Sequence, residues 1–161
     1  MIVVLIRHGN TFAQGDTPTW VGRAQDLPLV PAGYDQAHAV GRAILPISDR
    51  ILGIRSAGLK RSQQTAECIR DEIGREDLVV EVDGDLDEID YGKWGGLTTE
   101  EIQAAGFSRE LSDWNVHGTY PENCGWSTTE ASLMSAVARF LTGAIQRNRQ
   151  DGIEIAVTSN G

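Results

Sequence analysis

The sequence lacks several features that would each define a class of protein. It has only two cysteines, Cys68 and Cys124, whose wide separation favours free thiols over a disulfide framework or a metal site. Basic residues are scarce, 14 against 23 acidic ones, and the net charge of −9 argues against nucleic-acid binding and against adhesion to an anionic membrane. Arg7 interrupts the first apolar run too early for a signal peptide or a membrane span, so we expect a cytoplasmic protein.

Repeats, low-complexity segments and linkers are also absent. The 161 residues, 40% of them hydrophobic, suffice for one domain with a sizeable core. Apolar strand patterns alternate with helical ones, which predicts an α/β fold. The expected strands cover 3–6, 51–54, 78–82 and 153–158, and the expected helices 31–45, 59–73 and 128–149. Residues 12–29 contain two glycines and two prolines, and we expect them to form a long loop, as a lid or as the rim of a pocket.

The first strand runs directly into Arg7, His8 and Gly9. An uninterrupted apolar run suits a parallel strand covered on both faces, and ligands of such sheets bind beyond the carboxyl ends of the strands. The guanidinium of Arg7 matches two phosphate oxygens, and a neighbouring cation lowers the pKa of His8, which leaves a neutral nucleophile. Gly9 permits close approach of the backbone to a ligand. These residues predict a phosphoryl site, although a strand that simply meets water would look similar.

Two cations, Lys60 and Arg61, fall in the first turn of the helix expected over 59–73. Positive charge is unfavourable at a helix N-terminus unless an anion is bound there. We expect Lys60 to extend into solvent and Arg61 to join Arg7 at a bound phosphate.

Six acidic residues lie within 81–90, and Glu88 is one of them. Asp83, Asp85 and Asp87 have the spacing of an EF-hand, but Glu88 stands where that loop needs glycine and Trp94 where it needs glutamate, so calcium binding is a weak alternative. Repulsion between carboxylates and partial burial favour a protonated acid that can donate to a leaving group. Glu88 is the best placed, because Leu86 and Ile89 bracket it.

Together these stretches resemble the histidine phosphatase superfamily, also called phosphoglycerate-mutase-like. The matching motifs are LIRHG at 5–9, DLPL at 26–29, Gly33 with Gln36 and Ala37, LKRSQQTA at 59–66, LDE at 86–88 and GKWGG at 92–96. Their order and separation match along almost the whole chain.

The resemblance implies a three-layer sandwich, with a central, mostly parallel sheet flanked by helices. It also implies hydrolysis through a phosphohistidine, without metal or cofactor. His8 would take the phosphoryl group, Arg7 and Arg61 would hold its oxygens, and Glu88 would protonate the leaving oxygen. The expected substrate is a small phosphorylated molecule or a phosphoprotein, and inorganic phosphate is the product. The sequence itself does not identify the substrate.

Several positions depart from the family pattern. Asn10 and Gln14 replace residues that are often Glu and Asn, and both can still hydrogen-bond near a phosphate. Trp126 replaces a Glu, which puts substrate contacts there in doubt. Trp114, His117 and Tyr120 lie in a segment that we expect to be rich in loops; they could line the rim of the pocket, but packing is the favoured role for all three.

The most consequential departure is Asn160, which occupies the position of the second active-site histidine. An imidazolium would supply charge to the phosphoryl oxygens, whereas an amide offers only neutral donors. The sequence ends at Gly161, before the helix that would normally follow the last strand, so we expect a single domain over 1–161 that lacks this helix, as a truncated or a shortened form.

Three functions therefore remain open. The first is a phosphomonoesterase, which we favour because His8, Arg7, Arg61 and Glu88 are all present. The second is a protein that binds a phosphorylated ligand and has lost turnover through Asn160. The third is a mutase-type phosphoryl transfer, which is less favoured because the segment between Gly96 and Ser127 is short.

Overall fold

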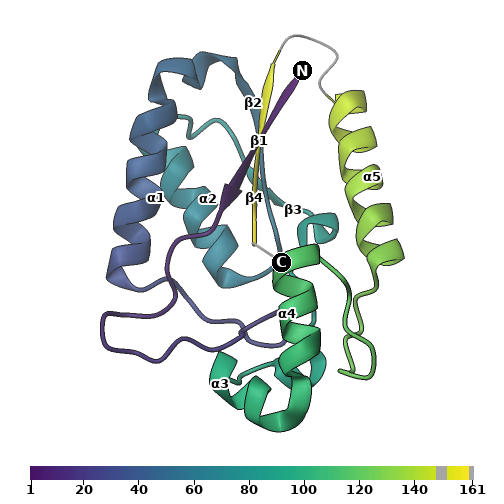
Figure 1. The fold of residues 1–161 in the computed structure, drawn as a ribbon. Coiled ribbons are helices and arrows are strands. Elements are labelled where there is room, and N and C mark those ends of the chain that lie inside the picture. Colours follow the sequence, from purple (N-terminus) through teal and green to yellow (C-terminus); the bar gives the residue numbers. More distant parts are fainter. Residues whose placement is uncertain (148–151, 160–161) are drawn as a thin grey trace.

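The computed structural model describes residues 1–147 and 152–159. Four strands form one sheet in the order β1-β4-β2-β3, and every neighbouring pair is parallel (Figure 1). The strands are β1 (Ile2–Arg7), β2 (Ile51–Ser56), β3 (Val80–Val82) and β4 (Ile153–Thr158). The α-helices are α1 (Pro31–Ile44), α2 (Lys60–Glu72), α3 (Thr99–Ile102), α4 (Ser108–His117) and α5 (Glu130–Arg147). Short helical turns cover Leu45–Arg50, Gly84–Leu86, Gly92–Trp94 and Gln103–Phe107.

Helices cover both faces of the sheet, which confirms the expected α/β sandwich. Helices α1 and α2 lie on one face and α5 on the other, while α3 and α4 lie beyond the carboxyl ends of the strands (Figure 1). None of the helices in the described ranges is long and apolar enough to cross a membrane.

The main core lies between the sheet and the helices α1 and α2. Strand β4 runs through the middle of the sheet, and its residues from Ile153 to Val157 are all buried. Ile54 of β2 and Ile69 of α2 are 1% and 0% exposed and belong to the same cluster. Parallel strands covered on both faces are apolar throughout, and the sequence of β4 fits this rule apart from Glu154.

The first strand is parallel, as predicted, but it is not covered on both faces. Within 1–147 and 152–159, β1 is an edge strand that pairs with β4 alone, and Ile2 and Leu5 are 48% and 67% exposed. An apolar run predicts burial only when neighbouring elements exist to cover it, and the sequence of β1 holds no information about its neighbours.

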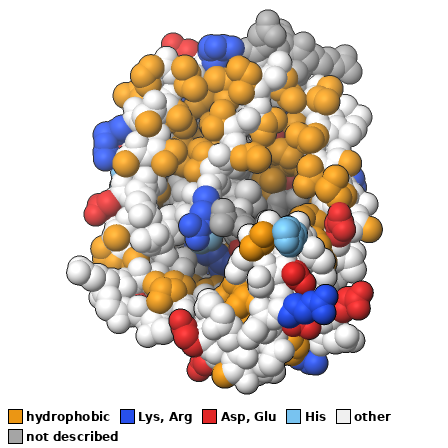
Figure 2. Space-filling view, viewed as in Figure 1, with side chains coloured by type: hydrophobic (Ala, Val, Ile, Leu, Met, Phe, Trp, Pro, Cys, Tyr) orange, Lys and Arg blue, Asp and Glu red, His pale blue; other side chains and the backbone are white. Residues whose placement is uncertain are grey.

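Helix α5 also presents apolar side chains to its surroundings. Phe140 is 4% exposed and packs with Ala57, Leu86 and Ala156, whereas Met134 and Ile145 are each 62% exposed. A cavity of about 470 Å³ lies between β1 and α5. Figure 2 shows hydrophobic side chains gathered on the part of this face that β1 and α5 form.

The segment that we expected to be loop-rich contains α3 and α4, so that expectation is wrong. Phe107, Leu111 and Trp114 are spaced four and three residues apart, which places them on one side of a helix. They pack in a second core cluster with Trp94 and Trp126, separate from the sheet. This cluster holds α4 beside the carboxyl ends of the strands.

Candidate active site

Gly9 places His8 at the tip of β1. A Cβ atom on Gly9 would lie 2.3 Å from the carbonyl oxygen of Gly33, so only glycine allows this turn to touch the start of α1. The backbone N–H of Gly9 donates to the hydroxyl of Thr65 (3.1 Å), and that of His8 continues the ladder to the carbonyl of Thr158 (3.0 Å). These contacts give the imidazole a fixed backbone.

The protonation of His8 follows from its two hydrogen bonds. Nε2 lies 3.1 Å from Nε of Arg61, which can only donate, so Nε2 must accept. Nδ1 then carries the proton and donates it to the carbonyl oxygen of Gly9 (2.7 Å). Burial, with smaller contributions from Arg61 and Arg7, lowers the pKa of His8 to about 4. The sequence predicted the direction of this shift, but burial is a larger cause than the neighbouring cations.

Arg61 comes from the first turn of α2 and is 1% exposed. Besides contacting His8, its guanidinium donates to the backbone carbonyls of Gln25 (2.8 Å) and Gly22 (3.0 Å). Gly22 has a φ of +58°, and a Cβ atom there would lie 2.7 Å from the ring of Tyr91, so glycine suits this position. Residues of the long loop therefore aim Arg61 at His8. Lys60 extends outward instead and forms an ion pair with Asp26 (3.7 Å).

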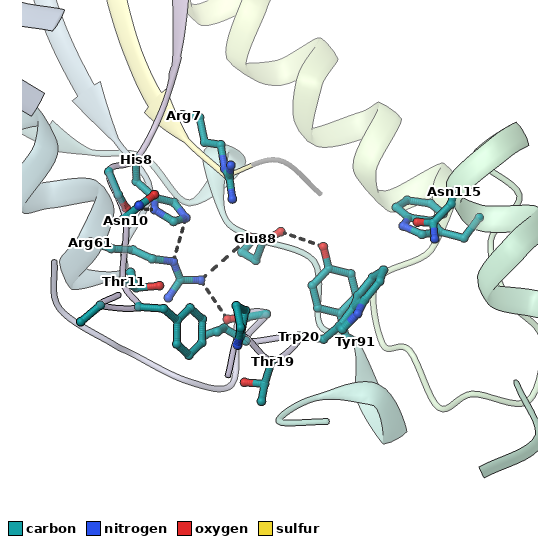
Figure 3. Close-up of a pocket in the computed structure, with 17 residues that line it drawn as sticks. Arg7, His8, Asn10, Thr11, Thr19, Trp20, Arg61, Glu88, Tyr91 and Asn115 are labelled. Atoms are coloured by element: carbon teal, nitrogen blue, oxygen red, sulfur yellow. Dashed lines mark hydrogen bonds and ion pairs between the residues drawn. The ribbon is translucent and has the colours of Figure 1, made fainter. Parts of the chain in front are cut away.

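Glu88 lies on the other side of Arg61. Its Oε2 is 3.9 Å from Nη2 of Arg61, and its side chain is 8% exposed. Oε1 accepts from the backbone N–H of Ile89 (3.0 Å) and from the hydroxyl of Tyr91 (3.5 Å). Figure 3 shows Arg61 between His8 and Glu88, with dashed lines to both.

Of the other residues predicted to contact phosphate, Arg7 and Asn10 line the cavity and Gln14 does not. Arg7 and Asn10 both line the cavity, and both are exposed. Arg7 has no ion pair with any residue in 1–147 or 152–159, so its fork is free to bind an anion. The backbone N–H of Asn10 donates to Oε1 of Gln36 (2.9 Å), and this hydrogen bond does not involve the side-chain amide of Asn10. Gln14 is exposed on the loop and is not among the residues that line the cavity.

The cavity encloses about 780 Å³ and opens beside His8. The loop over 12–29 forms its rim, as we expected, and supplies Phe12, Thr19 and Trp20. Tyr91, Trp114 and Asn115 line it as well. No pattern in the sequence pointed to Asn115. For Trp114, the sequence did not distinguish a role in the cavity from a role in packing. In the structure Trp114 is both, since it also packs edge-on against Trp126 (5.0 Å between ring centroids).

Two further predicted residues complete the survey. Asn160 lies outside the residues that the structure describes. His117 is exposed at the end of α4 and does not line the cavity. Within the described ranges, no group of three or more His, Cys, Asp or Glu side chains could hold a metal ion.

Known proteins resemble this chain in sequence and in fold. It is 29% identical to a 2,3-bisphosphoglycerate-dependent phosphoglycerate mutase of Methylobacterium sp. over 87% of this chain and 64% of that protein. It is 30% identical to the sedoheptulose 1,7-bisphosphatase of Saccharomyces cerevisiae over 84% of this chain and 54% of that one. A mycobacterial glucosyl-3-phosphoglycerate phosphatase, solved with VO3, superposes with a TM-score of 0.73 at 26% identity, over 96% of this chain and 74% of that one.

The chain thus spans between about half and two thirds of the length of these two curated relatives. The family model described as "Histidine phosphatase superfamily (branch 1)" matches residues 3–161. That match covers nearly every residue, including the strand tip, the start of α2 and the acidic segment that together surround the cavity. The chain belongs to the histidine phosphatase superfamily.

Proposed function

We propose that the protein is a phosphomonoesterase that works through a phosphohistidine on His8. The observation that carries this proposal is the hydrogen bond from Nε of Arg61 to Nε2 of His8, which fixes the lone pair of a neutral imidazole inside the cavity. A neutral imidazole held in one tautomer is a nucleophile at neutral pH.

In the first step, Nε2 of His8 attacks the phosphorus atom. The N–P bond forms while the bond from phosphorus to the ester oxygen breaks, and Glu88 in its acid form gives its proton to that oxygen. Arg7 and Arg61 stabilise the phosphoryl oxygens as the charge moves, because preorganised cations favour the transition state. Glu88 is left as a carboxylate, with Oε2 3.9 Å from Nη2 of Arg61.

In the second step, the carboxylate of Glu88 takes a proton from a water molecule that attacks the phosphohistidine. The N–P bond breaks, its electron pair returns to Nε2, and inorganic phosphate leaves. Glu88 regains its proton, so the cycle closes without a metal ion or a cofactor. Asn160 would contribute a neutral amide to the phosphoryl oxygens, and Asn10 a second one.

The test is hydrolysis of p-nitrophenyl phosphate together with an acid quench after mixing with labelled substrate. We expect release of p-nitrophenolate and an acid-labile phosphate on His8. Tight binding of phosphate without either signal would instead favour the alternative, a protein that binds a phosphorylated ligand without turnover.

A further inference from the structure

We infer that the cavity selects phosphomonoesters whose leaving group is an uncharged, ring-shaped polyol, such as a sugar, over those whose leaving group carries a second anion. This inference rests on the proposed function, because it takes the phosphoryl group to lie at His8. The cavity then has two ends. The phosphate end consists of Arg7, His8, Arg61 and Glu88, and the leaving-group end consists of Thr19, Trp20, Tyr91, Trp114 and Asn115.

Positive charge is confined to the phosphate end. Arg7 and Arg61 are the two arginines among the described residues that line the cavity, and no described lysine lines it. Figure 3 shows both beside His8, whereas Tyr91 and Asn115 lie on the opposite side with Glu88 between. A carboxylate or second phosphate at the leaving-group end would meet no described cation and would lie near the carboxyl group of Glu88. Taking such an anion out of water without a partner cation is unfavourable.

The leaving-group end is instead aromatic. Trp20 packs edge-on against Tyr91 (5.0 Å between ring centroids), and Tyr91 packs edge-on against Trp126 (5.0 Å), which in turn holds Trp114. All four tryptophans of the chain belong to this cluster. The faces of aromatic rings carry negative partial charge, so they attract C–H groups and repel anions. A sugar ring presents such C–H groups on its faces.

Neutral polar groups complete this end. The hydroxyl of Thr19 and the amide of Asn115 can each donate and accept, which suits the hydroxyls of a polyol. The volume of about 780 Å³ lies within the range of about 300–1,000 Å³ that is typical of pockets for larger organic ligands. A phosphorylated three-carbon acid would leave most of it empty, whereas a phosphorylated ring would contact the aromatic wall.

The first test compares kcat/KM for a panel of phosphomonoesters at one ionic strength. Glucose 6-phosphate has an uncharged ring, glycerol 3-phosphate is uncharged and acyclic, 3-phosphoglycerate carries a carboxylate, and fructose 1,6-bisphosphate carries a second phosphate. We expect glucose 6-phosphate to exceed both compounds with a second anion by about tenfold or more, because their extra charge would leave water for a site that offers no described cation and lies near a carboxyl group. It should also exceed glycerol 3-phosphate, which lacks the ring. Equal or better use of either anionic compound would overturn the inference.

A variant can reverse the selectivity. Asn115 is exposed near the C-terminus of α4, where a cation is favourable for the helix, so Asn115→Arg should fold. It should raise the kcat/KM for 3-phosphoglycerate relative to glucose 6-phosphate by roughly two- to fivefold, as an exposed ion pair does. Asn115→Gln controls for size, and Val116→Arg places the same charge on the next residue of α4, outside the cavity lining. An equal effect from Val116→Arg would assign the change to net charge and overturn the inference.

Failure of the inference differs from failure of the proposed function. Hydrolysis of p-nitrophenyl phosphate with a preference for anionic leaving groups would overturn only the inference. Absence of any turnover would overturn the proposed function, and calorimetric binding of the same panel would then still test the order. Tighter binding of glucose 6-phosphate than of 3-phosphoglycerate would support the inference, and the reverse order would refute it.

Discussion

His8 and Arg61, at the phosphate end of the cavity, are held by backbone carbonyl groups, whereas the aromatic side chains at the leaving-group end pack mainly against one another. Carbonyl oxygens of Gln25 and Gly22 position Arg61, and the carbonyl of Gly9 fixes the ring of His8. Trp20 and Trp114, by contrast, make edge-on contacts with other aromatic rings, and Nε1 of Trp20 also donates to the hydroxyl of Thr99 (3.3 Å). The hydrogen bonds to His8 and Arg61 are directional, whereas the contacts between aromatic rings depend on packing.

The two ends also draw on different parts of the chain. The phosphate end needs a few residues in short motifs, such as the turn after β1 and the first turn of α2. The leaving-group end draws on α4 and on the loop over 12–29, and this loop also supplies the Gly22 and Gln25 carbonyls that hold Arg61. Four predictions concern the phosphate end; the first three compare the effect of a change across substrates, and the fourth concerns the titration of His8.

The largest expected effect is the loss of the nucleophile. His8→Ala should reduce kcat for every phosphomonoester by about 10⁴-fold or more, because His8 is the one imidazole among the described residues that line the cavity. The labelled phosphate should disappear as well. His38→Ala, on α1, removes an imidazole outside the cavity and serves as the matched control. Hydrolysis by the His8 variant at the parent rate would refute the covalent mechanism.

The second prediction concerns the general acid. Glu88→Gln should reduce kcat by about 10²- to 10⁴-fold for alkyl phosphates, since their leaving oxygen needs a proton. The loss for p-nitrophenyl phosphate should be far smaller, because p-nitrophenolate leaves without one. Glu67→Gln, an exposed position on α2, controls for the substitution itself. Equal losses for both kinds of ester would assign Glu88 to holding Arg61 rather than to proton transfer.

The third prediction tests Asn160. Asn160→His should raise kcat by about 10²- to 10³-fold, which is the usual contribution of one preorganised donor at a reacting oxygen. The gain should be alike for glucose 6-phosphate and p-nitrophenyl phosphate, because the phosphoryl group is common to both. Asn10→His, at another position in the proposed phosphate contacts, shows whether any added imidazole suffices. A folded Asn160→His protein that binds phosphate normally and gains no rate would mean that Asn160 does not limit turnover.

The smallest effect is on pH dependence. An unfolded chain protonates His8 near its ordinary pKa of about 6.5, whereas burial lowers the pKa in the folded protein to about 4. The unfolded state therefore binds more protons between these values, and the free energy of unfolding should fall as the pH drops from about 6.5 to about 4. His8→Gln stays neutral and should lack this part of the slope. An NMR titration should place the midpoint for His8 near pH 4; a midpoint near 6.5 would contradict the buried, neutral imidazole.

The sequence predicted the phosphate end far better than the leaving-group end, for a physical reason. His8 and Arg61 lie where a strand ends and where a helix begins, and parallel strands bring such points to one edge of the sheet. Trp20, Tyr91 and Trp114 meet only through the packing of distant segments, which no local pattern encodes. The helical spacing of Phe107, Leu111 and Trp114 was visible in the sequence, and it would have predicted α4.

The sequence also did not predict which strand lies at the edge of the sheet or which side chains bind the backbone beside the start of α2. The apolar pattern of β1 predicted a strand but not its place at the edge of the sheet, since that depends on pairing. Asp26 and Asp87 lie in motifs that the sequence shares with the family, but no pattern predicted what they contact: they accept hydrogen bonds from the backbone N–H groups of Lys60 (2.6 Å) and Gly58 (2.9 Å) beside the start of α2. Both acids therefore help to orient the helix that carries Arg61.

In the proposed mechanism, the hydrogen bond between Arg61 and His8 also blocks the nucleophile until a substrate binds. While Nε of Arg61 donates to Nε2, the lone pair that is proposed to attack phosphorus is occupied. An oxyanion that binds the guanidinium would compete for this donor and free the lone pair when the phosphoryl group is bound. An uncharged carboxylic ester offers no such oxyanion and would leave the lone pair occupied. The contact that orients the proposed nucleophile would therefore disfavour neutral electrophiles.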